Sequence, residues 1–282
     1  MIDAHHHVWT LARGDYGWLR PESPIHRDYG LDDYRRVAPD TVGSILVQAA
    51  PTDAETRFML DVAAASEGLV LGVVGWTELS GADAPDRVAT LSQDKLIRGL
   101  RPMLQDIADV EHILRPELAA GLSAMVETGL RLDLLATPRH LALLPQLASR
   151  FPGLAAVLDH AGKPDIAGGA WPDWARDIAR IARDTPWFCK LSGLVTEAGT
   201  AWRTDDLRRY VDHLLDCFGP TRLMWGSDWP VVDLAGGLPR WRAATETLLP
   251  ADCREAVLGG NALRFYGISP AVGVSPTGVL PS

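Results

Sequence analysis

Three consecutive histidines stand near the start of the chain, in the apolar stretch MIDAHHHVWT. Because side chains alternate between the two faces of a β-strand, His5 and His7 would share one face with Asp3, and His6 would lie on the other. Two imidazoles on one face can share a metal ion or a substrate oxygen. A lone buried histidine usually has only a structural role, but here a second histidine faces the same way. We therefore take His5 and His7 as candidate site residues and expect His6 to point toward the helices or a loop.

Polar side chains also follow apolar runs along the rest of the chain. The residues at these positions include Gln48, Arg101, Asp133, His160, Lys163, Lys190 and Asp228. A buried polar group costs about 1–3 kcal/mol when it is left unpaired, so packing alone explains a whole set of them poorly. Their convergence on one face is the main argument for an enzyme. The remaining histidines His112, His140 and His213 fall on or beside helical patterns, and we expect them at the surface.

The elements that would position these side chains are short apolar runs that alternate with helical patterns. We predict strands at 1–5, 44–48, 70–76, 97–102, 130–135, 155–159, 187–191 and 223–226. Helices are predicted at 31–37, 52–66, 83–92, 116–128, 138–151, 174–184, 204–218 and within 240–265. Eight such βα units predict an α/β protein, a (β/α)8 TIM barrel, with the chemistry at the carboxyl ends of the strands. An open doubly wound sheet is the alternative, but no GxGxxG motif follows the first strand.

Two segments lie outside this repeat. The stretch 10–40 is long for a βα loop, so we expect it to cap the barrel mouth. We assign residues 1–267 to one barrel domain. Residues 268–282 lack periodicity, and we expect either a surface arm, packed on this chain or on the partner of a homodimer, or a disordered tail.

The overall composition limits the class of protein. The net charge of −9 disfavours nucleic acid and anionic membrane as partners. No apolar run approaches the ~20 residues that span a bilayer, and no signal peptide pattern follows the first Met. Three scattered cysteines imply no disulfide framework. These features predict a cytoplasmic protein with a small-molecule substrate.

Seven motifs then occur in a fixed order: IDAHHHVW, VQAAP, RGLRPMLQ, LDHAGKP, CKLSGL, LMWGSDWPV and GNALRFYG. Together they resemble the amidohydrolase superfamily, and within it the "amidohydrolase 2" group of sugar lactonases. This group hydrolyses L-fucono-, L-rhamnono- and L-galactono-lactones, and pyrone-dicarboxylate lactonase is a more distant relative. The resemblance runs from Ile2 to about Tyr266 and implies a TIM barrel and a role in carbohydrate catabolism.

The resemblance also implies roles for single residues. His5 and His7 match the HxH pair of the first strand, His160 the histidine after strand six, and Asp228 the aspartate after strand eight. The two-metal pattern of the superfamily needs a histidine after strand five and a bridging lysine or carboxylate on strand four, and this chain has neither. The resemblance thus implies at most one Zn²⁺, held by His5, His7 and Asp228 or His160, and not essential in relatives of this group.

Lactone hydrolysis needs a base for water, a donor for the oxyanion and an acid for the ring oxygen. We expect Asp228 to be the general base, with His160, His5 and His7 polarising the carbonyl. Donors that would hold the substrate are Arg101, Gln48, Lys163 and Lys190, although Lys190 can instead satisfy backbone groups. Trp9, Trp76 and Trp229 would stack on a sugar ring or pack in the core.

Two other functions remain open from the sequence. One is a metal-dependent decarboxylase or amide hydrolase on the same barrel, and the other is a binding protein without activity. A dicarboxylate such as that of a pyrone-dicarboxylate lactonase would need several arginines at the mouth. Only Arg101 clearly ends a strand, and Arg13 and Arg20 could come from segment 10–40, so a neutral aldonolactone fits better.

Overall fold

A computed structural model describes residues 1–269 of the chain. Eight parallel strands follow one another around a single sheet in the order β1 to β8. Their bounds are β1 Ile2–His6, β2 Gly43–Val47, β3 Val70–Gly75, β4 Ile97–Leu100, β5 Arg131–Leu134, β6 Ala156–Leu158, β7 Phe188–Leu191 and β8 Leu223–Trp225. The prediction of eight strands in a TIM barrel is confirmed, and the open sheet is excluded.

Backbone contacts between the first and last strands nearly close the barrel. Residues His6 and Trp229 form an isolated parallel bridge. The amide of His7 donates to the carbonyl of Trp229 at 2.7 Å, and the amide of Asp228 donates to the carbonyl of His5 at 2.8 Å. The closure therefore joins the two segments that carry His5, His7 and Asp228.

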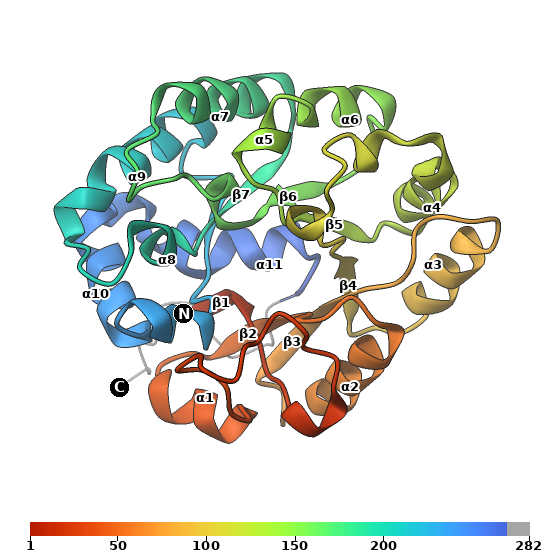
Figure 1. The fold of residues 1–282 in the computed structure, drawn as a ribbon, viewed down its shortest axis with the longest axis horizontal. Coiled ribbons are helices and arrows are strands. Elements are labelled where there is room, and N and C mark those ends of the chain that lie inside the picture. The colour runs from red at the N-terminus through yellow and green to blue at the C-terminus, as the bar shows by residue number, and fades with distance from the viewer. Residues whose placement is uncertain (270–282) are drawn as a thin grey trace.

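Helices surround the strands, as Figure 1 shows. They are α1 Leu31–Val37, α2 Asp53–Ala64, α3 Ala84–Ser92, α4 Ala119–Thr128, α5 Pro138–Leu141, α6 Leu144–Arg150, α7 Pro172–Asp184, α8 Leu194–Ala198, α9 Thr204–Phe218, α10 Leu238–Leu248 and α11 Asn261–Phe265. The helix predicted at 138–151 is split into α5 and α6, and α8 was not predicted. None of the described helices is long and apolar enough to cross a membrane.

The helices bind the barrel through regular apolar faces. In α9, the residues Leu207, Tyr210, Val211, Leu214 and Phe218 are buried, at the three- and four-residue spacing of one helical face. The strands are buried on both sides, because helices cover the outside and side chains fill the inside. This packing explains why the strands appear in the sequence as short continuous apolar runs.

A separate apolar cluster fills the part of the barrel interior toward the amino-terminal ends of the strands. Ile2 and Ala4 of β1 meet Val74, Val157 and Met224 there, together with Ala262, Phe265 and Tyr266 at the end of the described chain. Helix α11 thus closes the amino-terminal end of the barrel. Polar groups are left to the opposite end, where the strands terminate.

The segment 10–40 lies at that opposite end. The indole N–H of Trp9 donates to the carbonyl of Arg27 at 2.7 Å, and the ring packs against Tyr16, Trp18 and Tyr29. These aromatic contacts give the capping segment a small core of its own. The predicted arm or tail at 268–282 falls almost wholly on residues 270–282, which lie outside the described part of the chain.

Candidate active site

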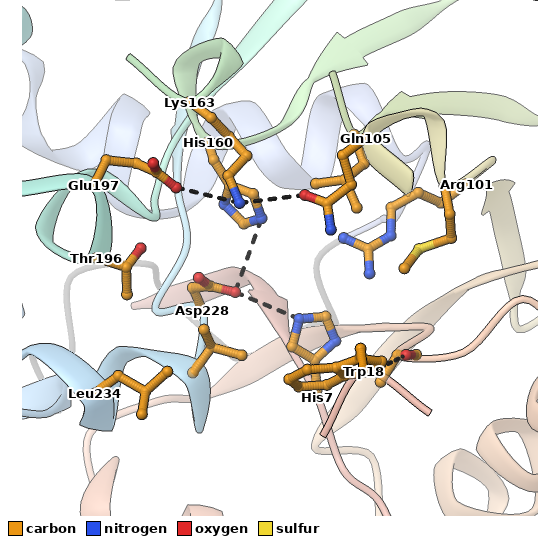
Figure 2. Close-up of a pocket in the computed structure, with 14 residues that line it drawn as sticks. His7, Trp18, Arg101, Gln105, His160, Lys163, Thr196, Glu197, Asp228 and Leu234 are labelled. Carbon is orange, nitrogen blue, oxygen red and sulfur yellow. Dashed lines mark hydrogen bonds and ion pairs between the residues drawn. The ribbon is translucent and has the colours of Figure 1, made fainter. Parts of the chain in front are cut away.

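A cavity of about 290 Å³ opens at the carboxyl ends of the strands. Its walls hold acidic, basic and apolar side chains, as Figure 2 shows. The lining residues are His7, Trp18, Ala49, Arg101, Met103, Gln105, Leu135, His160, Lys163, Thr196, Glu197, Asp228, Val231 and Leu234. The volume of the cavity is just below the usual range for ligand sites, which suits a small ligand.

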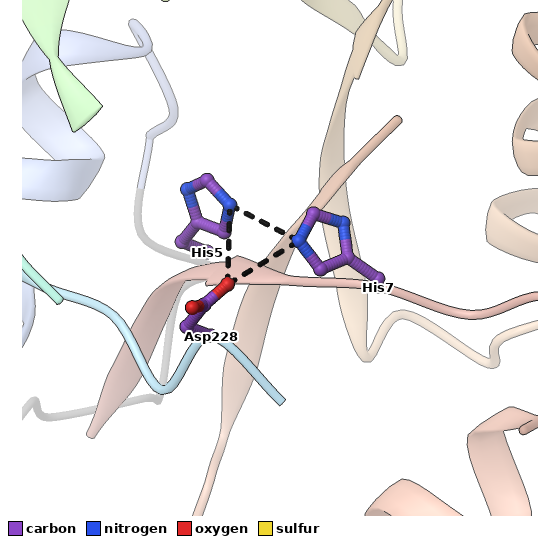
Figure 3. Close-up of side chains that lie close together, drawn as sticks. All are labelled: His5, His7 and Asp228. Carbon is purple, nitrogen blue, oxygen red and sulfur yellow. Dashed lines mark hydrogen bonds and ion pairs between the residues drawn. The ribbon is translucent and has the colours of Figure 1, made fainter. Parts of the chain in front are cut away.

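Asp228 lies at the centre of a cluster of histidines. Its Oδ1 atom is 3.4 Å from Nε2 of His7, 3.8 Å from Nε2 of His5 and 3.9 Å from Nε2 of His160. The two Nε2 atoms of His5 and His7 are 3.3 Å apart, as in Figure 3. Four side chains from three separate segments therefore meet at one point.

A bulge in β1 turns the side chains of His5 and His7 toward the inside of the barrel. The register against β2 shifts between Asp3 and His6. Asp3 accepts a hydrogen bond from the Tyr34 hydroxyl at 2.7 Å, and the ring of His6 stacks on the same tyrosine. Ala4 belongs to the cluster inside the barrel. The prediction that Asp3 shares a face with His5 is wrong, because the bulge breaks strict alternation.

We expected His6 to point toward the helices or a loop, and its contacts agree with that orientation. Its Nε2 atom lies 2.9 Å from the hydroxyl of Ser44, and the side chain is buried away from the cavity. His6 therefore holds β1 against β2 and the capping segment.

A left-handed turn presents His160 and Lys163 to the cavity. Four successive residues after β6 have positive φ, namely His160 at 51°, Ala161 at 52°, Gly162 at 68° and Lys163 at 53°. The amide of Lys163 donates to the carbonyl of His160 at 2.8 Å, and the Trp174 indole donates to that of Ala161. This conformation costs about 1–2 kcal/mol for each residue with a side chain. The surrounding hydrogen bonds and packing must offset that strain.

The cluster keeps Asp228 ionised. Burial alone would raise the pKa of this carboxyl, but at acidic pH the charge that His160 then carries, together with the hydrogen bond from His7, holds the pKa well below its usual value. Burial lowers the pKa of His160 to about 4, so this imidazole is neutral near pH 7. The cavity therefore contains an ionised carboxylate, which can accept a proton, beside a neutral imidazole.

A fully buried ion network lies beneath His5. The Lys190 ammonium is 2.5 Å from Oδ2 of Asp133, 3.0 Å from Oδ1 of Asp159 and 3.1 Å from Nδ1 of His5. Tyr266 also donates to Asp133, at 2.8 Å. The ammonium donates to Asp133 and His5 and forms an ion pair with Asp159. Lys190 is thus committed to structure and does not line the cavity.

This network indicates the tautomer of His5. Burial and the charge of Lys190 lower the pKa of His5, which is therefore neutral. The Lys190 contact at Nδ1 is shorter than the 3.5 Å from Nδ1 to Oδ1 of Asp159, and it favours the tautomer with the imidazole proton on Nε2. That proton faces Nε2 of His7, whose Nδ1 donates to the carbonyl of Val47 at 2.7 Å. Arg101 Nη1 also approaches His5 Nε2, at 3.3 Å, but it has its own acceptor in Asp159.

The donor set fits one zinc ion by distance. His5, His7 and Asp228 offer two nitrogens and one oxygen, all close to one another. Tetrahedral zinc with bonds of about 2.0–2.2 Å places its ligand atoms roughly 3.3–3.6 Å apart, and the separations here are 3.3–3.8 Å. Zinc binding also requires the lone pair of His5 Nε2, which the Lys190 contact disfavours.

The structure separates the predicted substrate-binding residues into two groups. Arg101 and Lys163 line the cavity together with His7, His160 and Asp228. Gln48 is buried and donates to the Arg101 carbonyl at 2.9 Å, while Arg101 donates back to the Gln48 carbonyl. Gln48 therefore orients Arg101 and does not itself face the cavity.

None of the three predicted tryptophans is part of the described cavity lining. Trp9 packs against the capping segment, and Trp229 packs against Tyr29 and Tyr34. Trp76 is half-buried beside α2, where its backbone pairs with Thr56. The positions of the three rings do not agree with stacking on a substrate. They agree with the alternative prediction, which is packing in the protein interior.

Several lining residues were not predicted. Trp18 is 41% exposed and lines the cavity, with its indole N–H donating to the Ala49 carbonyl at 2.8 Å. Gln105, Thr196 and Glu197 complete the polar wall. The capping role assigned to segment 10–40 could have drawn attention to Trp18. Nothing in the spacing marks Glu197, because it lies on the unpredicted helix α8.

A family model described as amidohydrolase matches residues 2–268, nearly the whole described chain. The chain belongs to the amidohydrolase family. The chain also resembles individual proteins of known name over nearly the full length of both sequences. It is 41% identical over 278 residues to an L-fucono-1,5-lactonase of Burkholderia ambifaria, covering 95% of each chain.

Two further proteins support the same placement. An L-fucono-1,5-lactonase of Burkholderia multivorans is 36% identical over 288 residues, with 95% of this chain and 96% of that protein covered. A crystal structure of a B. multivorans amidohydrolase with bound zinc matches with a TM-score of 0.88 at 35% identity. It covers 95% of this amidohydrolase and 99% of that chain.

Proposed function

We propose that the protein hydrolyses the lactone of a sugar acid, with Asp228 as general base. The observation that carries the proposal is the ionised Asp228 carboxylate in the cavity, within 4 Å of three imidazoles. The likeness to two proteins named L-fucono-1,5-lactonase supports an L-sugar lactone as substrate. Both the aldono-1,5- and the aldono-1,4-lactone ring are candidates.

In this mechanism Asp228 removes a proton from water, and the hydroxide attacks the lactone carbonyl. The ring bond breaks, and the protonated Asp228 then returns the proton to the leaving ring oxygen. One carboxylate thus serves as base and acid in turn, and the products are the open aldonic acid and the free enzyme.

The developing oxyanion needs donors inside the cavity. His160 can present Nε2–H, because the Ser192 hydroxyl lies 2.9 Å from its Nδ1 and can donate to it. Arg101 lines the same cavity and contributes positive potential, while its guanidinium already donates to Asp159 and to the Gln48 carbonyl. A single oxyanion donor contributes about 2.7–4 kcal/mol to the transition state.

We also propose that His5, His7 and Asp228 hold Zn²⁺ only weakly. When bound, zinc would polarise a carbonyl or lower the pKa of a bound water. The Lys190 ammonium opposes it by repelling the ion and by favouring the proton on His5 Nε2. We therefore expect hydrolysis to survive treatment with a chelator.

The proposal is tested by acid release from a panel of lactones, with and without EDTA. The panel contains L-fucono-, L-rhamnono-, L-galactono- and D-glucono-lactone and pyrone dicarboxylate. Turnover of an L-sugar lactone that persists in EDTA supports both parts of the proposal. Turnover lost on chelation and restored by zinc would overturn the metal proposal and leave the lactonase. Absence of turnover on every lactone would overturn the lactonase and favour a decarboxylase or amide hydrolase.

A further inference from the structure

An ion pair forms part of the outer wall of the cavity. Nζ of Lys163 lies 3.2 Å from Oε1 of Glu197 and donates to Oε1 of Gln105, also at 3.2 Å. The three side chains come from the left-handed turn after β6, from α8 and from the turn after β4. Figure 2 shows Lys163 between Glu197 and Gln105, on the side of the cavity that carries His160.

Both cations of the cavity lining already have partners. Arg101 is 3% exposed, and its guanidinium donates to Asp159 and to the Gln48 carbonyl. Lys163 faces Glu197. The lining also contains two carboxylates, Asp228 and Glu197, so its formal charge is balanced. A substrate carboxylate would find no uncommitted cation among the lining residues and would be repelled by two anions.

The same wall suits neutral hydroxyl groups. Each sugar hydroxyl both donates and accepts a hydrogen bond. Glu197 offers acceptors, Lys163 offers donors, and Gln105 and Thr196 offer both. Side chains of Trp18, Val231 and Leu234 line other parts of the cavity and supply apolar surface.

We propose that Glu197, held by Lys163, determines specificity by binding substrate hydroxyls and excluding lactones that carry a carboxylate. This inference rests on the proposed lactonase function and adds the residue that selects among lactones. Glu197 lines the cavity and is 24% exposed, so its charge faces a bound substrate at short range and dissolved salt still reaches it.

The test compares two lactones that differ at one carbon. L-galactono-1,4-lactone is neutral, and the corresponding galactarolactone has a carboxylate at carbon 6. L-fucono-1,5-lactone serves as the positive control for hydrolysis. For each lactone, kcat/KM is measured with the wild-type enzyme and with Glu197→Gln, which keeps the size of the side chain and removes its charge.

We expect the wild-type enzyme to favour the neutral lactone at least about tenfold, and Glu197→Gln to reduce this ratio about tenfold or more. Asp233→Asn is the matched control, because it removes a negative charge from the exposed position between Val231 and Leu234 without touching the cavity lining. Its ratio should stay within about twofold of the wild-type value.

A second measurement uses the wild-type enzyme alone. Raising the ionic strength from about 0.01 M to about 1 M should raise kcat/KM for the charged lactone and leave the neutral one unchanged, because salt screens the repulsion. This result is obtained even if Glu197→Gln does not fold.

The outcomes separate the two proposals. An unchanged ratio in folded Glu197→Gln, or equal hydrolysis of both galactose lactones by the wild type, would overturn the role of Glu197 while the lactonase stands. No hydrolysis of L-fucono-1,5-lactone or of either galactose lactone would overturn the lactonase and this inference with it.

Discussion

At the scale of single residues, Lys190 carries a charge at the centre of a fully buried network. Its ammonium is completely buried and is shared among Asp133, Asp159 and His5. Burying charges is unfavourable unless each finds a partner, and removing one partner leaves the others uncompensated. Lys190 therefore links the stability of the barrel interior to the orientation of His5.

We predict that Lys190→Met destabilises the protein by about 3–5 kcal/mol, because Asp133 and Asp159 lose their shared cation. Chemical denaturation measures this change in the free energy of unfolding. The exposed Lys95→Met is the control and should change stability by less than about 0.5 kcal/mol. Equal stability of the two variants would show that the network contributes little.

Residue types and strand ends allowed the main cluster to be predicted, but not the depth of each side chain. His5, His7, His160 and Asp228 were predicted from their places after strands, and the structure brings them together. Lys190 also belongs to a strand end, yet it points beneath the site. Whether a strand residue lies at the mouth or one layer below depends on the stagger of neighbouring strands, which a single sequence does not reveal.

At the scale of elements, helix α8 is positioned by a glycine at each end. Gly193 precedes it with φ 66° and Gly199 follows it with φ 79°. A side chain at Gly193 would place its Cβ 2.7 Å from Cγ of the His160 ring, whereas nothing lies within 4 Å of the corresponding position at Gly199. The first glycine thus permits close contact with a proposed catalytic imidazole.

We predict that Gly193→Ala lowers kcat/KM by about a hundredfold or more, because the added methyl group displaces His160 from Asp228. Gly199→Ala lacks that contact but has the greater backbone strain, because φ 79° and ψ 178° lie in a region almost confined to glycine. Its activity should stay within about threefold of wild type while its stability falls. Steady-state kinetics and thermal unfolding of both variants provide the measurement. Equal losses of activity would assign the effect to backbone strain alone.

Long elements were predictable, whereas short irregular ones were not. Helices such as α9 have a clear apolar face over several turns. Helix α8 has only five residues, and the bulge in β1 leaves no periodic signal. Both are decided by tertiary contacts, and both occur where the chain forms the site.

At the scale of the whole molecule, the eightfold alternation of strands and helices was sufficient to predict the barrel. Its near closure through β1 and β8 is what brings the two ends of the sequence into one site. Burial of individual polar residues was less predictable. His140 was expected at the surface, but it is 1% exposed, because α5 turns it inward, where its Nδ1 accepts from the Thr137 amide.

This burial gives a prediction for the pH dependence of stability. Burial and the charge of Arg139 lower the pKa of His140, so the unfolded chain binds a proton more readily than the folded one. The free energy of unfolding must then fall as the pH falls below about 6.5, by at most about 1.4 kcal/mol per pH unit for this group.

We therefore predict that His140→Asn loses less stability than the wild type between pH 7 and pH 5. Asn keeps an acceptor for the Thr137 amide but does not titrate. Denaturant unfolding at both pH values measures the difference, and contributions of all other groups cancel in the comparison. Parallel loss of stability in the two proteins would contradict the assigned role of His140.

The central claim is that Asp228 acts as general base on a sugar lactone. The most direct measurement is the rate of acid release from L-fucono-1,5-lactone in EDTA, for the wild type and for Asp228→Asn. We predict rapid release by the wild type and a kcat lower by about 10²–10⁴-fold in the variant, with the fold intact by circular dichroism. Unchanged turnover by folded Asp228→Asn would contradict the claim.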